Sequence, residues 1–321
     1  MKWSASLVQL PLLAAMLAAV PAEAQNYPSR PVRILVPLAA GGGMDTVTRS
    51  LAQKLSDSYG QTVVVDNRPG AGSLVSLEIL ANAAPDGYTL MMISATTVIY
   101  PLLYKSRFEV ARDFTPVAQM TAQGYALVVH PSIPAKSVAQ LVDYIRARPG
   151  QLNYASSGIG SPIHMTTELF QSATGTRMTH VPFKGMGAAY GDLLGGRIQL
   201  SFATIISSLA HVKAGRLRAL AVTPDKRAPI MPDVPTLKEA GVPVVVVNWY
   251  GLIAPPRTPQ ALVARISAEA VKAMQAPEMA KRLIAEGSEA VTSSPQAFAA
   301  HLRDEQAQWR RVIKEANIRP Q

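Results

Sequence analysis

The chain has 321 residues, of which 48% are hydrophobic and 16% are charged, a balance that excludes an intrinsically disordered protein and predicts one large or two ordinary globular domains. The formal net charge is +10, but the lysines and arginines are scattered without interleaved aromatic residues, which argues against nucleic acid as a partner. The sequence contains no cysteine, so disulfide bonds and thiol chemistry are excluded.

The first 24 residues have the organisation of a secretory signal peptide. Lys2 is followed by an apolar stretch over residues 7–20 and by Ala-Glu-Ala at 22–24, a cleavage site of small residues before Gln25. A membrane anchor is the alternative, and it is disfavoured because the stretch is shorter than the roughly 20 residues that a bilayer core requires. We therefore expect export, and a chain without disulfide bonds suits a bacterial periplasm.

Short β-rich apolar runs then alternate with longer amphipathic runs, which is the pattern of βαβ units and largely parallel strands. The predicted strands are residues 32–36, 61–66, 88–94, 125–130, 152–158, 179–185, 197–203, 217–223 and 244–254. The predicted helices are residues 45–58, 74–83, 137–148 and 206–214, one that begins near 161 and one that ends at 194. Two terminal helices open at Thr258 and Ser294, where a hydroxyl residue followed by proline forms a good N-cap and first-turn pair.

This number of βα units exceeds what one sheet usually holds. Two runs, near residues 122–126 and 244–250, could pass from one sheet into another. The sequence therefore predicts an α/β fold of two lobes, with two mostly parallel sheets flanked by helices and joined by two crossover strands. Residues 25–124 and 250–321 would form the first lobe, and residues 125–249 the second.

The loops that follow the predicted strands share one chemistry, because all are small and carry glycine or hydroxyl residues. They read AAGGGMD at 39–45, PGAGS at 69–73, SATT from Ser94 to 97, SSGIGS at 156–161 and FKGMG at 183–187. Glycine permits positive φ and close approach of the backbone, and the first-turn amides of a helix attract anions. None of the loops fits a dinucleotide fingerprint, a P-loop or a nucleophile elbow. We therefore expect an anion site without a nucleotide or a catalytic nucleophile.

Catalytic and metal-binding constellations are missing from the sequence. The five histidines are dispersed, and His164 with Glu168 at i, i+4 has no third metal ligand nearby. His164 could instead form a polar wall of the site or be a satisfied core histidine. Asp45 could contact a ligand or only cap its own helix, and Lys184 could face an anion or solvent. We expect no enzyme activity, no cofactor and no metal.

Six motifs give the chain a strong resemblance to the Bug family, the TctC-like substrate-binding receptors of tripartite tricarboxylate transporters. They are YPSRPVRILVPLAAGGGMDTVTRSLAQKL at 27–55, VVVDNRPGAGS at 63–73, APDGYTLMM at 84–92, LNYASSGIGSPIHM at 152–165, VPFKG at 181–185 and PDVPTLKEAG at 232–241. The resemblance implies a monomeric periplasmic binding protein whose two lobes close over a small organic carboxylate and deliver it to membrane transporter subunits. Carried over residue by residue, it also implies ligand contacts at Ala40, Gly41, Gly42, Asp45, Gly72, Ser73, Ser157, Gly158, Ser161, His164, Lys184 and Gly185.

The sequence departs from the usual family pattern at several of these motifs. Leu38 and Ala39 replace residues that often include Phe, Ser73 stands where a second glycine is common, and Phe183 replaces a frequent Tyr. Ser73 adds a hydroxyl and Phe183 removes one, so the ligand cannot be copied from a relative. Two alternatives to a transport receptor stay open at this point: a ligand-loaded sensor that signals to a membrane kinase, and an exported α/β hydrolase.

Overall fold

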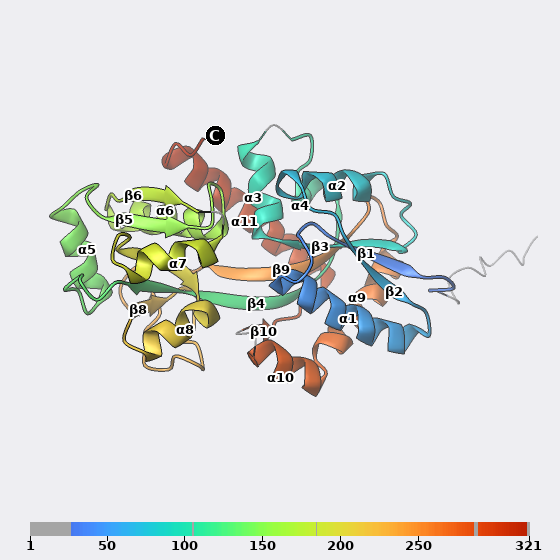
Figure 1. Ribbon diagram of the computed structural model, residues 1–321. Helices are drawn as coiled ribbons and strands as arrows, with labels where there is room; N and C mark the ends of the chain where they lie inside the picture. The colour runs from blue at the N-terminus through green and yellow to red at the C-terminus, as the bar shows by residue number, and fades with distance from the viewer. Residues whose placement is uncertain (1–26, 105, 184, 286–287, 320–321) are drawn as a thin grey trace, which may run out of the picture.

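The computed structural model describes residues 27–104, 106–183, 185–285 and 288–319, and the predicted signal peptide lies outside them. Two α/β halves lie side by side, and two long strands, β4 and β9, run between them (Figure 1). Among the described residues, no helix combines the length and the apolar character needed to cross a membrane.

The first half contains the early strands and the C-terminal helices. Its sheet has the order β2-β1-β3-β9-β4, in which β1 pairs in parallel with β2 and β3, whereas β9 is antiparallel to β3 and to β4. Its elements are β1 (Val32–Val36), α1 (Gly43–Tyr59), β2 (Val63–Asn67), η2 (Ala71–Ser73), α2 (Leu74–Ala81), β3 (Thr89–Ser94), α3 (Ala95–Leu103), α4 (Val110–Asp113), β9 (Val247–Ala254), α9 (Gln260–Met274), α10 (Pro277–Ala285), β10 (Glu289–Ala290) and α11 (Pro295–Glu315).

The second half is built on the other end of β4 (Thr115–Val129), which pairs antiparallel with β7 and β8, while β5 is parallel to β7 and β6. Its remaining elements are α5 (Val138–Arg146), β5 (Asn153–Ser156), α6 (Pro162–Thr174), β6 (Thr179–Pro182), α7 (Met186–Leu194), β7 (Leu200–Thr204), α8 (Ile205–Lys213) and β8 (Arg218–Val222). The two-lobed α/β architecture is thus confirmed, but each sheet is mixed and not mostly parallel: β1, β2 and β3 and β5, β6 and β7 pair in parallel, whereas every pairing of β4 and β9 is antiparallel.

Strand β4 is much longer than the predicted strand at 125–130, because it has 15 residues and begins at Thr115. Its first part pairs with β9 as far as Gly124, and its last part pairs with β7 from Tyr125 onward. The first part escaped prediction because Pro116, Gln119 and Thr121 interrupt the apolar pattern, and the ladder contains register shifts in this region. The lobe boundaries at 124/125 and 249/250 stay a prediction.

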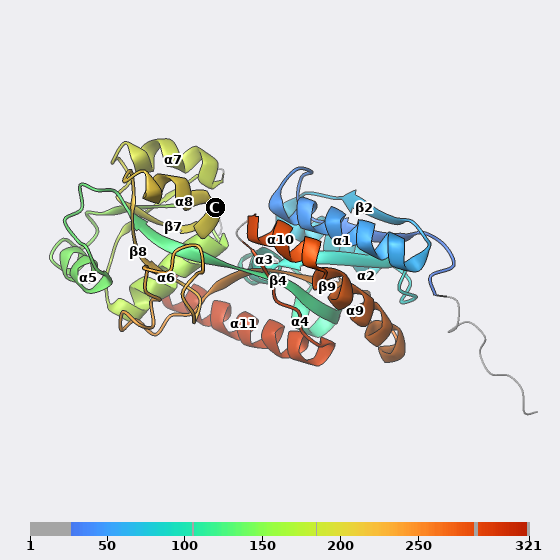
Figure 2. The same ribbon diagram turned by 90° about the horizontal axis from the view of Figure 1, so that it is seen from below.

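The C-terminal helix α11 reaches both halves, since it packs against α3, α4 and β4 and also against α6 (Figure 2). Its predicted N-cap is confirmed, because Ser294 Oγ accepts a hydrogen bond from the amide of Ala297 at 3.2 Å. The N-cap predicted at Thr258 is wrong, because α9 begins at Gln260 and the Thr258 hydroxyl donates backward to the carbonyl of Pro255 at 2.8 Å.

Candidate functional site

The loop between β1 and α1 brings the start of a helix to the carboxyl end of a parallel strand. Gly42 is the N-cap of α1 with φ −82°, and the left-handed conformation belongs to Gly41, with φ +88°. The Gly41 amide donates to Asp45 Oδ2 at 2.9 Å, so the loop folds back onto its own helix. Gly43 lies against the second crossing strand, since a Cβ there would be 3.2 Å from the Tyr250 hydroxyl.

The carboxylate of Asp45 is fully engaged within the protein. Besides the Gly41 amide, Arg49 Nε donates to it at 2.9 Å and Asn67 Nδ2 at 3.0 Å. Burial alone would raise the pKa of Asp45, but the hydrogen bonds from Arg49, Gly41 and Asn67 outweigh burial and lower that pKa below its usual value. Asp45 therefore stays ionised and fixes the shape of the glycine loop.

The predicted residues Gly72, Ser73 and Ser94 meet beneath helix α3. Thr97 Oγ1 donates to Ser73 Oγ at 3.2 Å and lies 3.5 Å from the Ser94 amide. Ser73 and Ser94 are both buried, and the Ser73 hydroxyl and the Ser94 amide support the first turn of α3 through Thr97. Gly72 has φ +58°, and a Cβ there would lie 1.8 Å from Tyr100 Cδ1. Glycine at position 72 is therefore required by the position of the Tyr100 ring.

In the second half, the loop from β5 to α6 is held from behind by two stacked histidines. The His164 and His180 rings are 3.9 Å apart at 7°. His164 Nδ1 accepts a hydrogen bond from the Gly160 amide at 3.1 Å, and His180 Nε2 lies 2.6 Å from Ser156 Oγ. Ser161 is the N-cap of α6 and accepts from the His164 amide at 3.3 Å. The structure thus places His164 beneath the loop as a buried, hydrogen-bonded residue.

Both histidines are neutral at ordinary pH. Burial lowers the pKa of His164 to about 3, with a smaller contribution from His180, and burial lowers the pKa of His180 to about 4. The neutral state matches the geometry, because Nδ1 of His164 can accept from Gly160 only without a proton of its own. The histidine pair therefore holds the loop by hydrogen bonds and by stacking of neutral rings.

The close pair of Ser156 and His180 bears on the hydrolase alternative. Their 2.6 Å separation matches a nucleophile and its base, but Ser156 is fully buried and also bonds to the backbone of Gly158. Within residues 27–319, as far as they are described, no group of three metal-ligating side chains occurs either. The pair therefore has a structural role in shaping the loop.

A cavity of about 550 Å³ lies between the two halves, with helix α3 as one wall and the loops after β5 and β6 as the other. It brings together the predicted residues Ser157, Gly158 and Ser161. It is lined by Thr96, Tyr100, Tyr104, Ser157, Gly158, Ile159, Ser161, Pro162, Pro182 and Phe183. Gly185 follows this wall as the N-cap of α7 with φ +91°, and Lys184 lies outside the described residues.

A smaller cavity of about 240 Å³ lies at the start of α1. It is lined by Gly43, Thr46, Val47, Gln123, Tyr250 and Ser288, so α1 meets both crossing strands here. Ala40, Gly41 and Gly42 precede this wall in the chain but line neither cavity. Sequence reasoning missed Tyr250, Gln123 and the α3 aromatics, although the spacing of Tyr100 and Tyr104 on a helix after the SATT loop was a usable signal.

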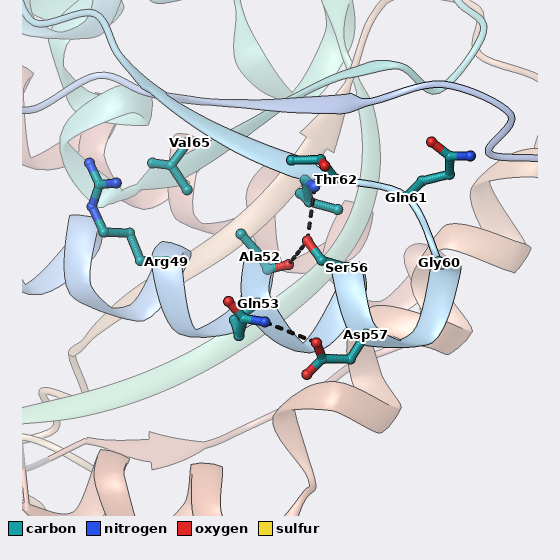
Figure 3. Close-up of a pocket in the computed structure, with 10 residues that line it drawn as sticks. Arg49, Ala52, Gln53, Ser56, Asp57, Gly60, Gln61, Thr62 and Val65 are labelled. Atoms are coloured by element: carbon teal, nitrogen blue, oxygen red, sulfur yellow. Dashed lines mark hydrogen bonds between the residues drawn. The ribbon is translucent and has the colours of Figure 1, made fainter.

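A third hollow, of about 550 Å³, lies on the flank of the first half between α1 and β2 (Figure 3). Its polar groups already bond to one another: Gln53 Nε2 donates to Asp57 at 2.9 Å, and Ser56 Oγ bridges the Ala52 carbonyl and the Val63 amide. None of the predicted site residues lines it, so we place the candidate site between the halves.

Comparison with known proteins identifies proteins that are similar to this chain in sequence and in structure. Residues 47–318 match the model of the tripartite tricarboxylate transporter family receptor. The protein BugT of Bordetella pertussis is 34% identical over 305 residues, with 94% of each chain covered. The R. palustris protein Rpa4515, solved with adipate, is 36% identical with a TM-score of 0.77, and 92% of this chain and 100% of that chain are covered. MatC from Rhodopseudomonas palustris, solved with bound malate, is 31% identical with a TM-score of 0.74, and 89% and 100% are covered.

Proposed function

This chain belongs to the family of tripartite tricarboxylate transporter receptors, and on that premise we propose that it is a periplasmic receptor that binds a small organic carboxylate and delivers it to a membrane transporter. The family is one of solute-binding receptors, not of enzymes. Adipate in Rpa4515 and malate in MatC support a carboxylate as the class of ligand.

The observation that carries the proposal is the cavity between α3 and the loop after β5, because its two walls belong to different halves of the molecule. A ligand that touches both walls stabilises the arrangement in which the halves approach each other. Such a difference between an empty and a loaded form is what a membrane partner would recognise.

Hydrogen-bond donors for a carboxylate come from both halves of the molecule. In the first half, the first-turn amides of α1, which lie outside the lining of this cavity, have no acceptor within the helix and carry partial positive charge. In the second half, Ser157 and Ser161 offer hydroxyls from the cavity wall. We assign direct ligand contacts to the loop and wall residues Ala40, Gly42, Ser157, Gly158, Ser161, Lys184 and Gly185.

The remaining predicted residues act in this proposal by holding those contacts in place. Asp45 and Gly41 set the shape of the first loop, and His164 sets that of the loop after β5. Gly72, Ser73 and Ser94 support α3 from below. The proposal includes cleavage before Gln25 and a monomer of two lobes, 25–124 with 250–321 and 125–249.

A thermal-shift screen of mono-, di- and tricarboxylates against the mature protein tests the proposal. A ligand at a hundredfold excess over its dissociation constant should stabilise the folded state by about 2.7 kcal/mol. Titration calorimetry then compares Ser157→Ala, which removes a hydroxyl from the cavity, with Ser172→Ala, an exposed serine at the far end of α6, as the matched control. Absence of any carboxylate-induced shift would contradict the proposal, and so would equal affinity in the two variants.

A further inference from the structure

One wall of the interlobe cavity is an aromatic face on helix α3. Thr96 and Tyr100 line the cavity from one side of α3, four residues apart, and Tyr104, the C-cap of the helix, continues this wall. The rings of Tyr100 and Tyr104 stack with centroids 4.5 Å apart and planes inclined by 19°. The stacked pair thus places two aromatic rings at the space between the halves.

The opposite wall also contains apolar side chains. Phe183 contributes a third ring at the end of β6, and Ile159, Pro162 and Pro182 surround it. The polar groups of this wall are the hydroxyls of Ser157 and Ser161, both on the loop after β5. The cavity therefore combines ring-bearing walls with a polar edge at Ser157 and Ser161, and its described lining residues carry hydroxyls but no formal charge.

The aromatic wall is held in place by two close contacts that only glycine permits. A Cβ at Gly72 would lie 1.8 Å from the ring of Tyr100, so the backbone beneath α3 supports that ring directly. A Cβ at Gly160 would lie 2.3 Å from Leu103 Cδ1, so the second half touches α3 on its neighbouring turn. Tyr100 is thus a preorganised surface, and preorganisation reduces the entropic cost of binding.

This chemistry favours one type of carboxylate over another. A flat ring gains from offset or edge-to-face contact with other rings, beyond the burial of its area. A second carboxylate on an aliphatic chain would have to be desolvated against the same rings. From these walls we propose that the ligand is an aromatic carboxylate, whose ring lies between Tyr100 and Phe183 and whose single carboxylate meets the polar edge. The inference rests on the proposed function and narrows its ligand class.

Titration calorimetry with four acids tests the inference: benzoate, cyclohexanecarboxylate, adipate and malate. Cyclohexanecarboxylate has the size and charge of benzoate without its π face. We expect benzoate to bind about tenfold more tightly than cyclohexanecarboxylate, and both aliphatic diacids to bind more weakly than benzoate. If cyclohexanecarboxylate equals benzoate, or if adipate or malate binds more tightly, the inference is overturned while the carboxylate receptor stands. If none of the four acids binds while another carboxylate shifts the melting temperature, the inference is overturned and the carboxylate receptor stands; if no carboxylate of the wider screen binds, both proposals fail.

Variants of the two walls locate the ring. Phe183→Leu and Tyr100→Leu each remove one ring and keep an apolar side chain, and Tyr144→Leu on helix α5 is the matched control outside the cavity. We expect the first two to reduce benzoate affinity about tenfold and the control to leave it unchanged. Circular dichroism checks that each variant is folded. If Tyr100→Leu unfolds because the packing of Tyr100 on Gly72 is lost, the benzoate affinity of Phe183→Leu alone tests the inference. Unchanged benzoate affinity in the folded wall variants would overturn the inference.

Discussion

The buried carboxyl group of Glu305 makes the stability of the protein dependent on pH. Glu305 lies on α11, where Trp249 Nε1 donates to its Oε1 at 2.8 Å, and its Oε2 has no partner among the described residues. Burial raises the pKa of Glu305 from 4.5 to about 7, against the smaller opposing effects of the indole groups of Trp249 and Trp309. Because the folded chain holds the proton more tightly than the unfolded chain, its contribution to stability is complete below pH 4.5 and is lost as the pH rises through 7.

The Glu305→Gln variant keeps an oxygen that can accept from Trp249 and cannot ionise. At 1.36 kcal/mol per pKa unit, the shift corresponds to about 3 kcal/mol. We expect the variant to match the wild type at pH 5 and to exceed its free energy of unfolding by up to about 3 kcal/mol at pH 8. Urea denaturation at both pH values measures the two free energies.

Two controls isolate this effect. Asp57→Asn removes an exposed carboxylate from α1 and is the control for the loss of one negative charge at the surface. The buried histidines are present in both proteins, so their titration cancels in the difference between wild type and variant. A difference that is the same at pH 5 and pH 8 would refute the reasoning, because Glu305 would then not change its protonation in the folded state.

Three further outcomes follow from the loops and the lobe contact. Asp45→Ala removes a charged hydrogen-bond acceptor and should lower the free energy of unfolding by about 2 kcal/mol in urea titrations. It should also reduce carboxylate affinity at least tenfold in calorimetry. Unchanged affinity would show that the loop keeps its shape without Asp45. The folded-state pKa of His164, about 3, lies below the unfolded value of 6.5, so the free energy of unfolding should fall as the pH drops from 6.5 toward 4. The His164→Asn side chain can still accept from Gly160 but does not titrate, so this variant should lose less stability over the same range in urea denaturation. An equal loss in wild type and variant would contradict this role of His164. Gly160→Ala should lower the free energy of unfolding by about 1–3 kcal/mol, because its Cβ would clash with Leu103. The double variant with Leu103→Ala should therefore lose less stability than the sum of the two single variants. Strictly additive losses would show that the contact is unimportant.

Local patterns predicted the alternation of strands and helices and the glycine-bearing loops at strand ends. They failed where the deciding interaction is distant in the chain. Ser156 and His180 meet because β5 and β6 pair in parallel, with Tyr154 opposite His180, and no spacing within either segment reveals that register. Tyr250 likewise lies close to Gly43 in space although the two residues are far apart in the sequence.

The site residues show the same division between local and distant causes. The sequence identified Asp45 as a residue of the first loop, but its engagement with Asn67 depends on the pairing of β1 with β2. The first part of β4 was not predicted as a strand, because its polar residues are buried by β9 and by helices that follow much later in the chain.

The crossing of the two halves by β4 and β9 has a mechanical consequence. A flexible tether between lobes would sample many relative orientations, and a ligand would have to offset that freedom when it bound. Here the connection is a hydrogen-bonded two-stranded ribbon, and β4 belongs to both sheets without interruption. Relative motion is therefore a bend or twist of the ribbon, with few orientations to lose. In the proposed receptor, a ligand would therefore draw the halves together with little entropic penalty, and changes at the loop ends would alter ligand preference without altering the ribbon that joins the halves.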